Sequence, residues 1–327
     1  MNFNKIKIVP IKGDASFRKF YRKKINNKSS IVIYAKKEKT KNLLNYDSIN
    51  KLLLKKKISA PKLISENFSN NFIEIEDLGK ETIFDIFKKK KINKLKIYKK
   101  ILVILIKLQN IKLRKIKNFK KKFYKIPNYS KKLIFREANL FLDWYVPHII
   151  NKNKRSKIRN ELKIIIASLI KKIQLPNTTF VHRDFHISNL MINKNKISII
   201  DSQDAVYGNI AYDLASLIDD VRLKTSTNFK EIIYKSYLNL NKKKINETKF
   251  QNDFAILSVL RNLKVIGIFT RLANRDKKKR YLKLIPYAWK LIEDRIDNND
   301  IFRDLKKKLE DNFPKKIRIK KWKLKLH

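Results

Sequence analysis

The sequence predicts an α+β protein with a small mixed N-terminal lobe, residues 1–79, and a larger, mainly helical C-terminal lobe, residues 80–327. Short runs of β-branched and aromatic residues occur before Gly79. After Gly79, several long segments carry apolar residues at intervals of three and four, the spacing that lines one face of a helix. A chain of 327 residues is also long enough for two lobes.

The N-terminal lobe is expected to contain a strand, a helix and a second strand. The first strand is predicted in "SSIVIYAKK", residues 29–37, because β-branched and aromatic side chains dominate it. Helical spacing follows at residues 42–58, and Pro61 then ends the helix. The second strand, residues 70–79, runs into a turn.

The C-terminal lobe is expected to be built from helices punctuated by prolines. A stretch of loop and strand interrupts them at residues 178–201. The segments with helical spacing are residues 81–91, 94–111, 134–150, 157–173 and 254–273.

The charge of the chain is extreme, with 80 Lys and Arg against 29 Asp and Glu. Such an excess fits a nucleic acid or membrane surface as partner. Because the excess of Lys accompanies many Ile and Asn and only 4 Gly, compositional drift with solvated Lys faces is the favoured interpretation. The absence of Cys excludes disulfides and thiolate metal sites. Without an apolar run of about 20 residues, we expect a cytoplasmic protein.

The stretch "FVHRDFHISNLMINKNKISIIDSQDA", from Phe180 to Ala205, carries the chemistry. A β-hairpin of this size brings its two open ends together, so Asp184, Asn189 and Asp201 are expected to face one spot. Phosphoryl transfer needs a carboxylate that accepts the proton of the acceptor hydroxyl and oxygen ligands that hold Mg²⁺. We predict Asp184 as the base and Asn189 and Asp201 as the metal ligands.

The motif "HRDFHISN", followed by "IIDSQDAVYGNIAYDLASL", resembles the aminoglycoside phosphotransferase and choline kinase superfamily, relatives of the protein kinases. The resemblance implies a bilobal protein-kinase-like fold and ATP as the phosphate donor. With "GDASFRKFYR", "IEDLG" and "FREANLFLDWYV", the chain is similar to one branch, the bacterial anomeric kinases of N-acetylmuramate and N-acetylglucosamine. That similarity spans roughly residues 8–300 and implies a sugar substrate and a role in cell-wall recycling.

The resemblance also implies further site residues. A loop over the ATP phosphates would contain Gly13, Asp14, Ala15, Ser16 and Phe17. A hinge that contacts adenine would contain Glu76, Asp77 and Leu78, and Lys36 is the candidate for the lysine that grips the phosphates.

Other residues of the motifs are expected to support the site or to contact the acceptor. His182 and Arg183 are interpreted as scaffolding, and Asp213 has the position of a helix N-cap and, by the resemblance, braces the catalytic loop. The candidates for contact with the substrate are His186, Gln203 and Asp204.

Several functions remain open at this stage. The acceptor can also be choline, homoserine or an aminoglycoside, because acceptor specificity does not reside in these motifs. A non-catalytic basic protein that binds nucleic acid or membranes on a kinase scaffold is the alternative from another class. A monomer is expected.

Overall fold

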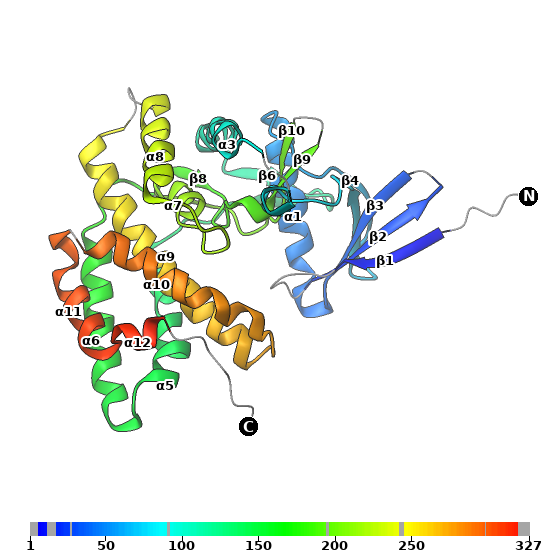
Figure 1. Cartoon of the computed structure of the whole chain (residues 1–327). Coiled ribbons are helices and arrows are strands. Elements are labelled where there is room, and N and C mark those ends of the chain that lie inside the picture. Colours follow the sequence, from blue (N-terminus) through cyan, green and yellow to red (C-terminus); the bar gives the residue numbers. More distant parts are fainter. Residues whose placement is uncertain are drawn as a thin grey trace, which may run out of the picture. The chain divides into compact units, whose positions relative to one another are not determined.

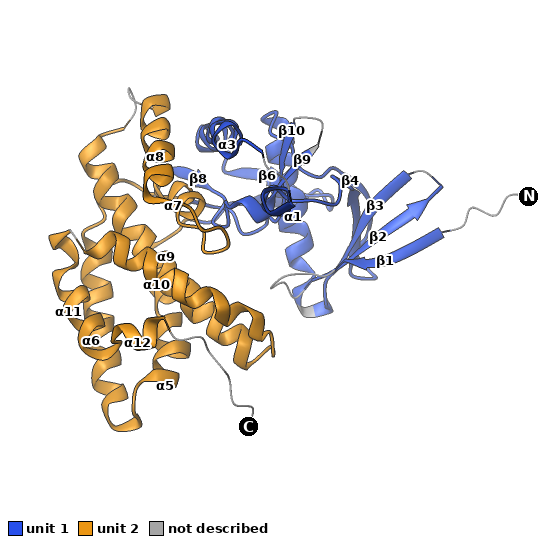
Figure 2. Cartoon of the chain, viewed as in Figure 1, with its two compact units in different colours: residues 1–127, 179–207 blue, residues 128–178, 208–327 orange. Residues whose placement is uncertain are grey.

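The computed structural model describes residues 6–11, 18–26, 28–89, 92–193, 196–241, 245–297 and 299–319. The chain forms two compact units: unit 1 is residues 1–127 and 179–207, and unit 2 is residues 128–178 and 208–327 (Figure 2). Unit 1 contains an antiparallel sheet and unit 2 is helical, so the predicted α+β class is confirmed. The lobe boundary after Gly79 stays a prediction.

Unit 1 is built on a five-stranded antiparallel sheet in the order β1-β2-β3-β5-β4 (Figure 1). One face packs on helix α1 (Lys41–Lys55) and is fully apolar at its centre, where Ile33 pairs with Ile73 across β3 and β5. Both side chains are fully buried, which stabilises unit 1 by about 1.5–3 kcal/mol for each residue. The strands are β1 (Ile6–Ile11), β2 (Lys19–Ile25), β3 (Lys28–Tyr34), β4 (Leu63–Asn67) and β5 (Phe72–Glu76).

Two helices and three short strand pairs complete unit 1. The hairpin of β9 (Leu190–Asn193) and β10 (Lys196–Ile199) is tied to the N-terminal part of the chain, because Ile199 donates its N–H to the Ser59 carbonyl at 2.8 Å. The remaining elements are η1 (Lys37–Lys39), α2 (Ile83–Lys89), α3 (Lys94–Gln109), β6 (Lys115–Lys117), β7 (Phe123–Lys125), β8 (Thr179–Val181), η3 (Ile187–Asn189) and β11 (Val206–Gly208).

Unit 2 is arranged around the long helix α9 (Glu247–Asn274), in which every residue from Asp253 to Leu263 is buried. A helix that is buried on all sides forms the centre of a core. The surrounding helices are α4 (Lys131–Ala138), α5 (Val146–Ile149), α6 (Lys152–Lys171), α7 (Tyr212–Ile218), α8 (Thr227–Asn241), α10 (Ile285–Ile296), α11 (Arg303–Asn312) and α12 (Lys315–Arg318), with short 3₁₀ turns η4 (Lys279–Leu284) and η5 (Asp300–Phe302).

The helix predicted over residues 134–150 is not continuous. Helix α4 ends at Ala138, and the π-helical turn η2 (Phe141–Tyr145) separates it from α5. Pro147 has no N–H to continue the α-helical ladder, and the N–H of Val146 instead reaches back five residues to the Phe141 carbonyl. Gly267 of α9 lies against this turn, since a Cβ there would be 2.2 Å from the carbonyl carbon of Leu140.

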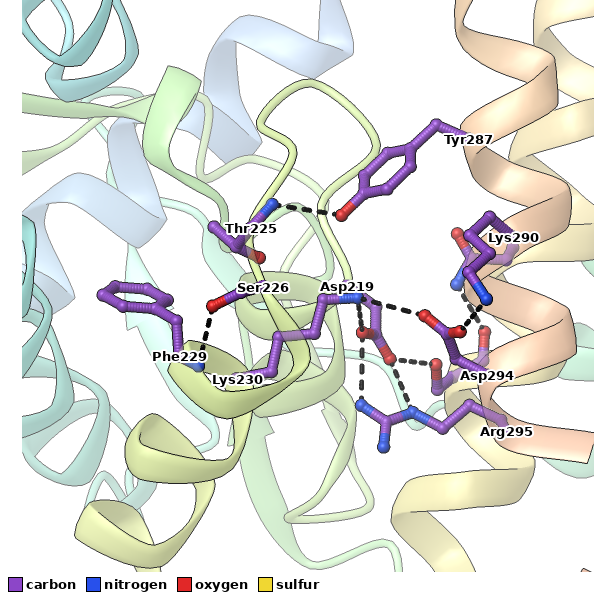
Figure 3. Close-up of polar contacts among 11 residues, drawn as sticks. Asp219, Thr225, Ser226, Phe229, Lys230, Tyr287, Lys290, Asp294 and Arg295 are labelled. Atoms are coloured by element: carbon purple, nitrogen blue, oxygen red, sulfur yellow. Dashed lines mark hydrogen bonds and ion pairs between the residues drawn. The ribbon is translucent and has the colours of Figure 1, made fainter. Parts of the chain in front are cut away.

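A buried ionic cluster anchors the segment that follows α7 in unit 2 (Figure 3). The Asp219 side chain is 1% exposed and accepts hydrogen bonds from Arg295 Nε at 2.9 Å and from Ser258 Oγ at 2.5 Å. Lys230 Nζ lies 3.3 Å from the same carboxylate. One anion therefore joins the end of α7 to helices α8, α9 and α10.

None of the described helices is both long enough and apolar enough to cross a membrane.

Candidate active site

The loop between β8 and β9 is closed by hydrogen bonds between its own residues. The side-chain amide of Asn189 donates to the Asp184 carbonyl at 3.0 Å, and the His186 N–H donates to the same oxygen at 3.1 Å. Ile200 donates its N–H to the Asn189 carbonyl at 3.0 Å, so the residue before Asp201 is held beside Asn189. These hydrogen bonds bring Asn189 close to the residue before Asp201, as the predicted hairpin requires.

Two residues of this segment have left-handed backbone conformations. Arg183 has φ 74° and Asp201 has φ 63°, a region that residues other than Gly rarely adopt. Such strain concentrates at functional sites, where it aims a side chain that a relaxed backbone would direct elsewhere.

The charges of the predicted base, Asp184, and of the predicted metal ligand, Asp201, act on the buried ring of His182. Burial lowers the pKa of this fully buried imidazole, whereas the negative charges of Asp184 and Asp201 favour its protonated form. Because a carbonyl oxygen only accepts, His182 Nε2 donates to Ile200 O at 3.2 Å. Burial and the hydrogen bond to the Ile200 carbonyl agree with a scaffolding role for His182.

Arg18 is the main site residue that the sequence reasoning missed. Its side chain is 3% exposed and forms an ion pair with Asp201, while its Nη1 donates to Gln203 Oε1 at 2.8 Å. Gln203 in turn donates to Asp201 at 3.2 Å and to Asp204 at 2.9 Å. The only signal in the sequence was the position of Arg18 inside the "GDASFRKFYR" motif.

Helix α1 supports the segment that carries Asp201. Ser202 Oγ donates to Asn50 Oδ1 at 2.7 Å, and both residues are buried. On the same helix, the Asp47 carboxylate is 2.8 Å from Lys51 on the next turn.

The predicted hinge is clamped by Arg22 of β2. Its guanidinium donates to Asp77 at 2.6 and 3.1 Å and to the Gly79 carbonyl at 2.6 Å. Burial alone would raise the pKa of Asp77, but hydrogen bonds from Arg22 and from the Gly79 N–H hold it below its usual range. Gly79 has φ 111°, a conformation that favours glycine.

A cavity of about 430 Å³ adjoins this clamp within unit 1. Four of its lining side chains are cationic, which suits an anionic ligand. The residues around it are Arg22, Lys24, Asn26, Lys28, Ser29, Asp77, Gly79 and Lys80.

The structure places the other predicted residues as follows. Lys36 is exposed just beyond the end of β3, and His186 is buried in the loop between β8 and β9. Arg183 donates to the Asp204 carbonyl at 3.2 Å. The five predicted phosphate-loop residues, Gly13 to Phe17, lie outside the described residues.

The prediction that Asp213 is a helix N-cap is wrong. Helix α7 begins at Tyr212 with Ala211 in the cap position, so Asp213 lies inside the first turn and is buried. The side chain of Asn209 accepts the Ala211 N–H at 2.9 Å, and Asn209 itself is held by Asp253 at 2.7 Å. The Ala215 N–H, which an N-cap at Asp213 would accept, donates instead to the Ala211 carbonyl at 3.0 Å.

The oxygen atoms of the predicted metal ligands suit a hard cation that is also bound to phosphates. Among residues 6–319 with the stated gaps, no group of three or more His, Asp or Glu is arranged to hold a metal ion. Mg²⁺ is generally held by one or two protein oxygen ligands together with substrate phosphates and water. Asn189 and Asp201 offer ligands of this kind.

Comparisons with known proteins agree with this chemistry. Over 295 residues the chain is 27% identical to the N-acetylmuramate/N-acetylglucosamine kinase of Pseudomonas aeruginosa, covering 88% of this chain and 82% of that enzyme. The enzyme of the same name from Neisseria meningitidis is 27% identical over 283 residues, covering 84% of this chain and 81% of that enzyme.

Solved structures share the protein-kinase-like fold. An ethanolamine kinase from Plasmodium vivax matches with a TM-score of 0.59 and 15% identity, covering 91% of this chain and 84% of that chain. An ADP-bound aminoglycoside phosphotransferase matches with a TM-score of 0.57 and 15% identity, covering 88% of this chain and 92% of that chain. The predicted fold is confirmed.

Residues 7–245, well over half of the chain, match the model of the phosphotransferase enzyme family. The chain is therefore a phosphotransferase and belongs to that family.

Proposed function

We propose that this phosphotransferase is an ATP-dependent sugar kinase that phosphorylates the anomeric hydroxyl of N-acetylmuramate or N-acetylglucosamine. The observation that carries the transfer chemistry is the closed loop, in which the Asn189 side chain donates to the Asp184 carbonyl and Ile200, the residue before Asp201, donates to the Asn189 carbonyl. The acceptor is supported by the names of relatives that match more than four fifths of both chains.

Each catalytic residue has one role in the transfer. The acceptor hydroxyl oxygen forms a bond to the γ-phosphorus of ATP, the bond from that phosphorus to the ADP oxygen breaks, and Asp184 accepts the hydroxyl proton. Asn189 and Asp201 would hold Mg²⁺, which supplies positive charge against the phosphate oxygens when it is bound. The chain itself contributes positioning and charge stabilisation.

The remaining predicted residues bind the two substrates or support the loop. We assign adenine to the backbone of the hinge, where Arg22 and Asp77 fix the conformation. For the phosphates, the resemblance suggests the loop from Gly13 to Phe17 and, as the candidate lysine, Lys36. Acceptor contacts are assigned to His186, Gln203 and Asp204, and structural support to His182, Arg183 and Asp213.

The test is a screen for phosphate transfer from Mg·ATP to N-acetylmuramate, N-acetylglucosamine, choline, homoserine and an aminoglycoside. We expect a product of either amino sugar whose NMR spectrum shows phosphorus coupled to the anomeric proton. Asp184→Asn should lower kcat by about 10²-fold or more, and Asp300→Asn, at a side chain that is 91% exposed, is the matched control.

The outcomes separate the candidate functions. Phosphorylation of choline, homoserine or the aminoglycoside alone would overturn the acceptor and keep the kinase. Wild-type turnover in Asp184→Asn would overturn the role of the base. Binding of nucleic acid that weakens with salt, without any ATP turnover, would favour the non-catalytic alternative.

A further inference from the structure

We infer that Arg18 is the cation that binds the ATP phosphates in this chain, and that Asp201 and Gln203 position it. The inference rests on the proposed kinase function and identifies a residue that the motifs had not assigned.

Burial of the charged Arg18 side chain has to be compensated by other interactions. Its side chain is 3% exposed, whereas a guanidinium without compensation in such a place is costly. The charge is compensated by the ion pair with Asp201, and Gln203 accepts from the second terminal nitrogen at 2.8 Å. The chain has 80 Lys and Arg, few of those that the structure describes are buried, and Arg18 is one of them.

Two aromatic rings further restrict the direction of the guanidinium. Its central carbon lies 5.4 Å from the ring centre of Phe20 and 5.6 Å from that of Tyr46. These distances allow cation–π attraction. Burial raises the pKa of Tyr46 to about 12, so this ring remains a neutral phenol. The fork of Arg18 is thus preorganised.

Arg18 lies beside the proposed metal ligand, where the reaction requires the ATP phosphates to bind. The guanidinium touches Asp201, the carboxylate proposed to hold the metal, and metal-bound phosphate oxygens lie beside such a ligand. In the sequence, Arg18 directly follows the segment from Gly13 to Phe17 that is predicted to cover the phosphates. A planar guanidinium binds phosphate with two parallel hydrogen bonds, which a lysine cannot do.

The alternative cation, Lys36, is less well placed. Ala35 is fully buried in the sheet core, whereas Lys36 is exposed just after it. A strand lysine that grips phosphates is oriented by an acid on the adjacent helix, but Asp47 of α1 is already paired with Lys51. Arg18 instead has its orienting acid in Asp201.

The experiment compares binding of ATP with binding of adenosine, which lacks phosphates, by calorimetry on the full chain with Mg²⁺. Arg18→Gln should weaken ATP binding by roughly 10- to 100-fold, because a charge-assisted contact is lost, and should leave adenosine binding unchanged. Arg18→Lys, which retains charge but loses the fork, should weaken ATP binding by about threefold or more. Arg303→Gln, at a side chain that is 78% exposed, is the matched control and should remain within about twofold of the wild type.

A purely structural role for Arg18 predicts a different pattern. It would reduce the affinity for ATP and adenosine in parallel, and that result, or unchanged ATP affinity in Arg18→Gln, overturns the inference. If Arg18→Gln fails to fold by circular dichroism, Arg18→Lys decides, and equal ATP affinity in that variant is the contrary result. Failure of the kinase function on which the inference rests is distinct, because the wild type itself would then show neither ATP binding nor turnover.

Discussion

Replacement of Asp219 by Asn tests how much the buried ionic cluster stabilises unit 2. The substitution keeps the shape of the side chain and removes the charge, which leaves Arg295 and Lys230 facing an amide (Figure 3). Removing one partner of a buried ion pair costs about 3–5 kcal/mol. The exposure of Arg295, 25%, places the expected loss at the lower end, about 3 kcal/mol.

The assay is urea unfolding followed by tryptophan fluorescence, which reports unit 2 through Trp144 and Trp289. The matched control is Asp294→Asn, whose main partner Lys290 is 60% exposed. Exposed pairs contribute about 1 kcal/mol or less. The two substitutions should therefore differ clearly in their unfolding midpoints.

The pH dependence provides a second check. Burial alone would raise the pKa of Asp219, but Arg295 and Lys230 hold it below 3.8. Its stabilising contribution is therefore present above pH 3.8 and is lost as the pH falls through the lower folded value. The difference between wild type and Asp219→Asn should be constant around neutral pH and should shrink in acid. A loss no larger than that of Asp294→Asn would refute the reasoning, since the charge would then contribute no net stability.

Two other substitutions test packing and titration. Gly267→Ala gains about 1 kcal/mol of helix propensity, but its Cβ would lie 2.2 Å from the Leu140 carbonyl carbon. We therefore expect the free energy of unfolding to fall by about 2 kcal/mol or more in the same fluorescence assay. Equal or greater stability would contradict the close approach. Because the folded pKa of His182 is lowered below 6.5, its protonation favours the unfolded chain, and stability should fall as the pH drops below 6.5. Urea unfolding of the metal-free protein, followed by circular dichroism at several pH values, gives the free energy of unfolding. As the pH falls, this free energy should decrease more steeply in wild type than in His182→Gln, by up to about 1.4 kcal/mol per pH unit. Identical slopes would show that His182 does not titrate in this way.

The elements with strong local patterns were predictable from the sequence. Strand β3, helix α1 and strand β5 were expected from their side chains, as was the hairpin of β9 and β10. Strands β1 and β2 were not expected, because β1 is exposed at nearly every position and β2 carries basic residues along both faces. Neither strand shows the alternation by which a half-buried strand is recognised. Tertiary pairing in the sheet, and not local pattern, selects their conformation.

The candidate site was predictable to the extent that spacing determines it. The order of Asp184, Asn189 and Asp201 indicated phosphoryl transfer, and the family match agrees with that reaction. Arg18 could not be singled out, because its charge is one of 80 in the sequence and only burial against Asp201 distinguishes it. The misplaced cap at Asp213 has a different cause, since helix ends depend on turn residues such as Asn209 that periodicity does not reveal.

Because Arg183 and Asp201 have left-handed conformations, a screen for folding and a screen for activity should select different residues at these positions. In a library screened only for abundance of folded protein, Gly and Asn should be enriched at both positions, because they relieve the backbone strain at φ 74° and 63°. A screen for phosphate transfer should retain Asp201 despite that strain. The two enrichment profiles would diverge most strongly at the residues where the chain sacrifices stability for catalysis.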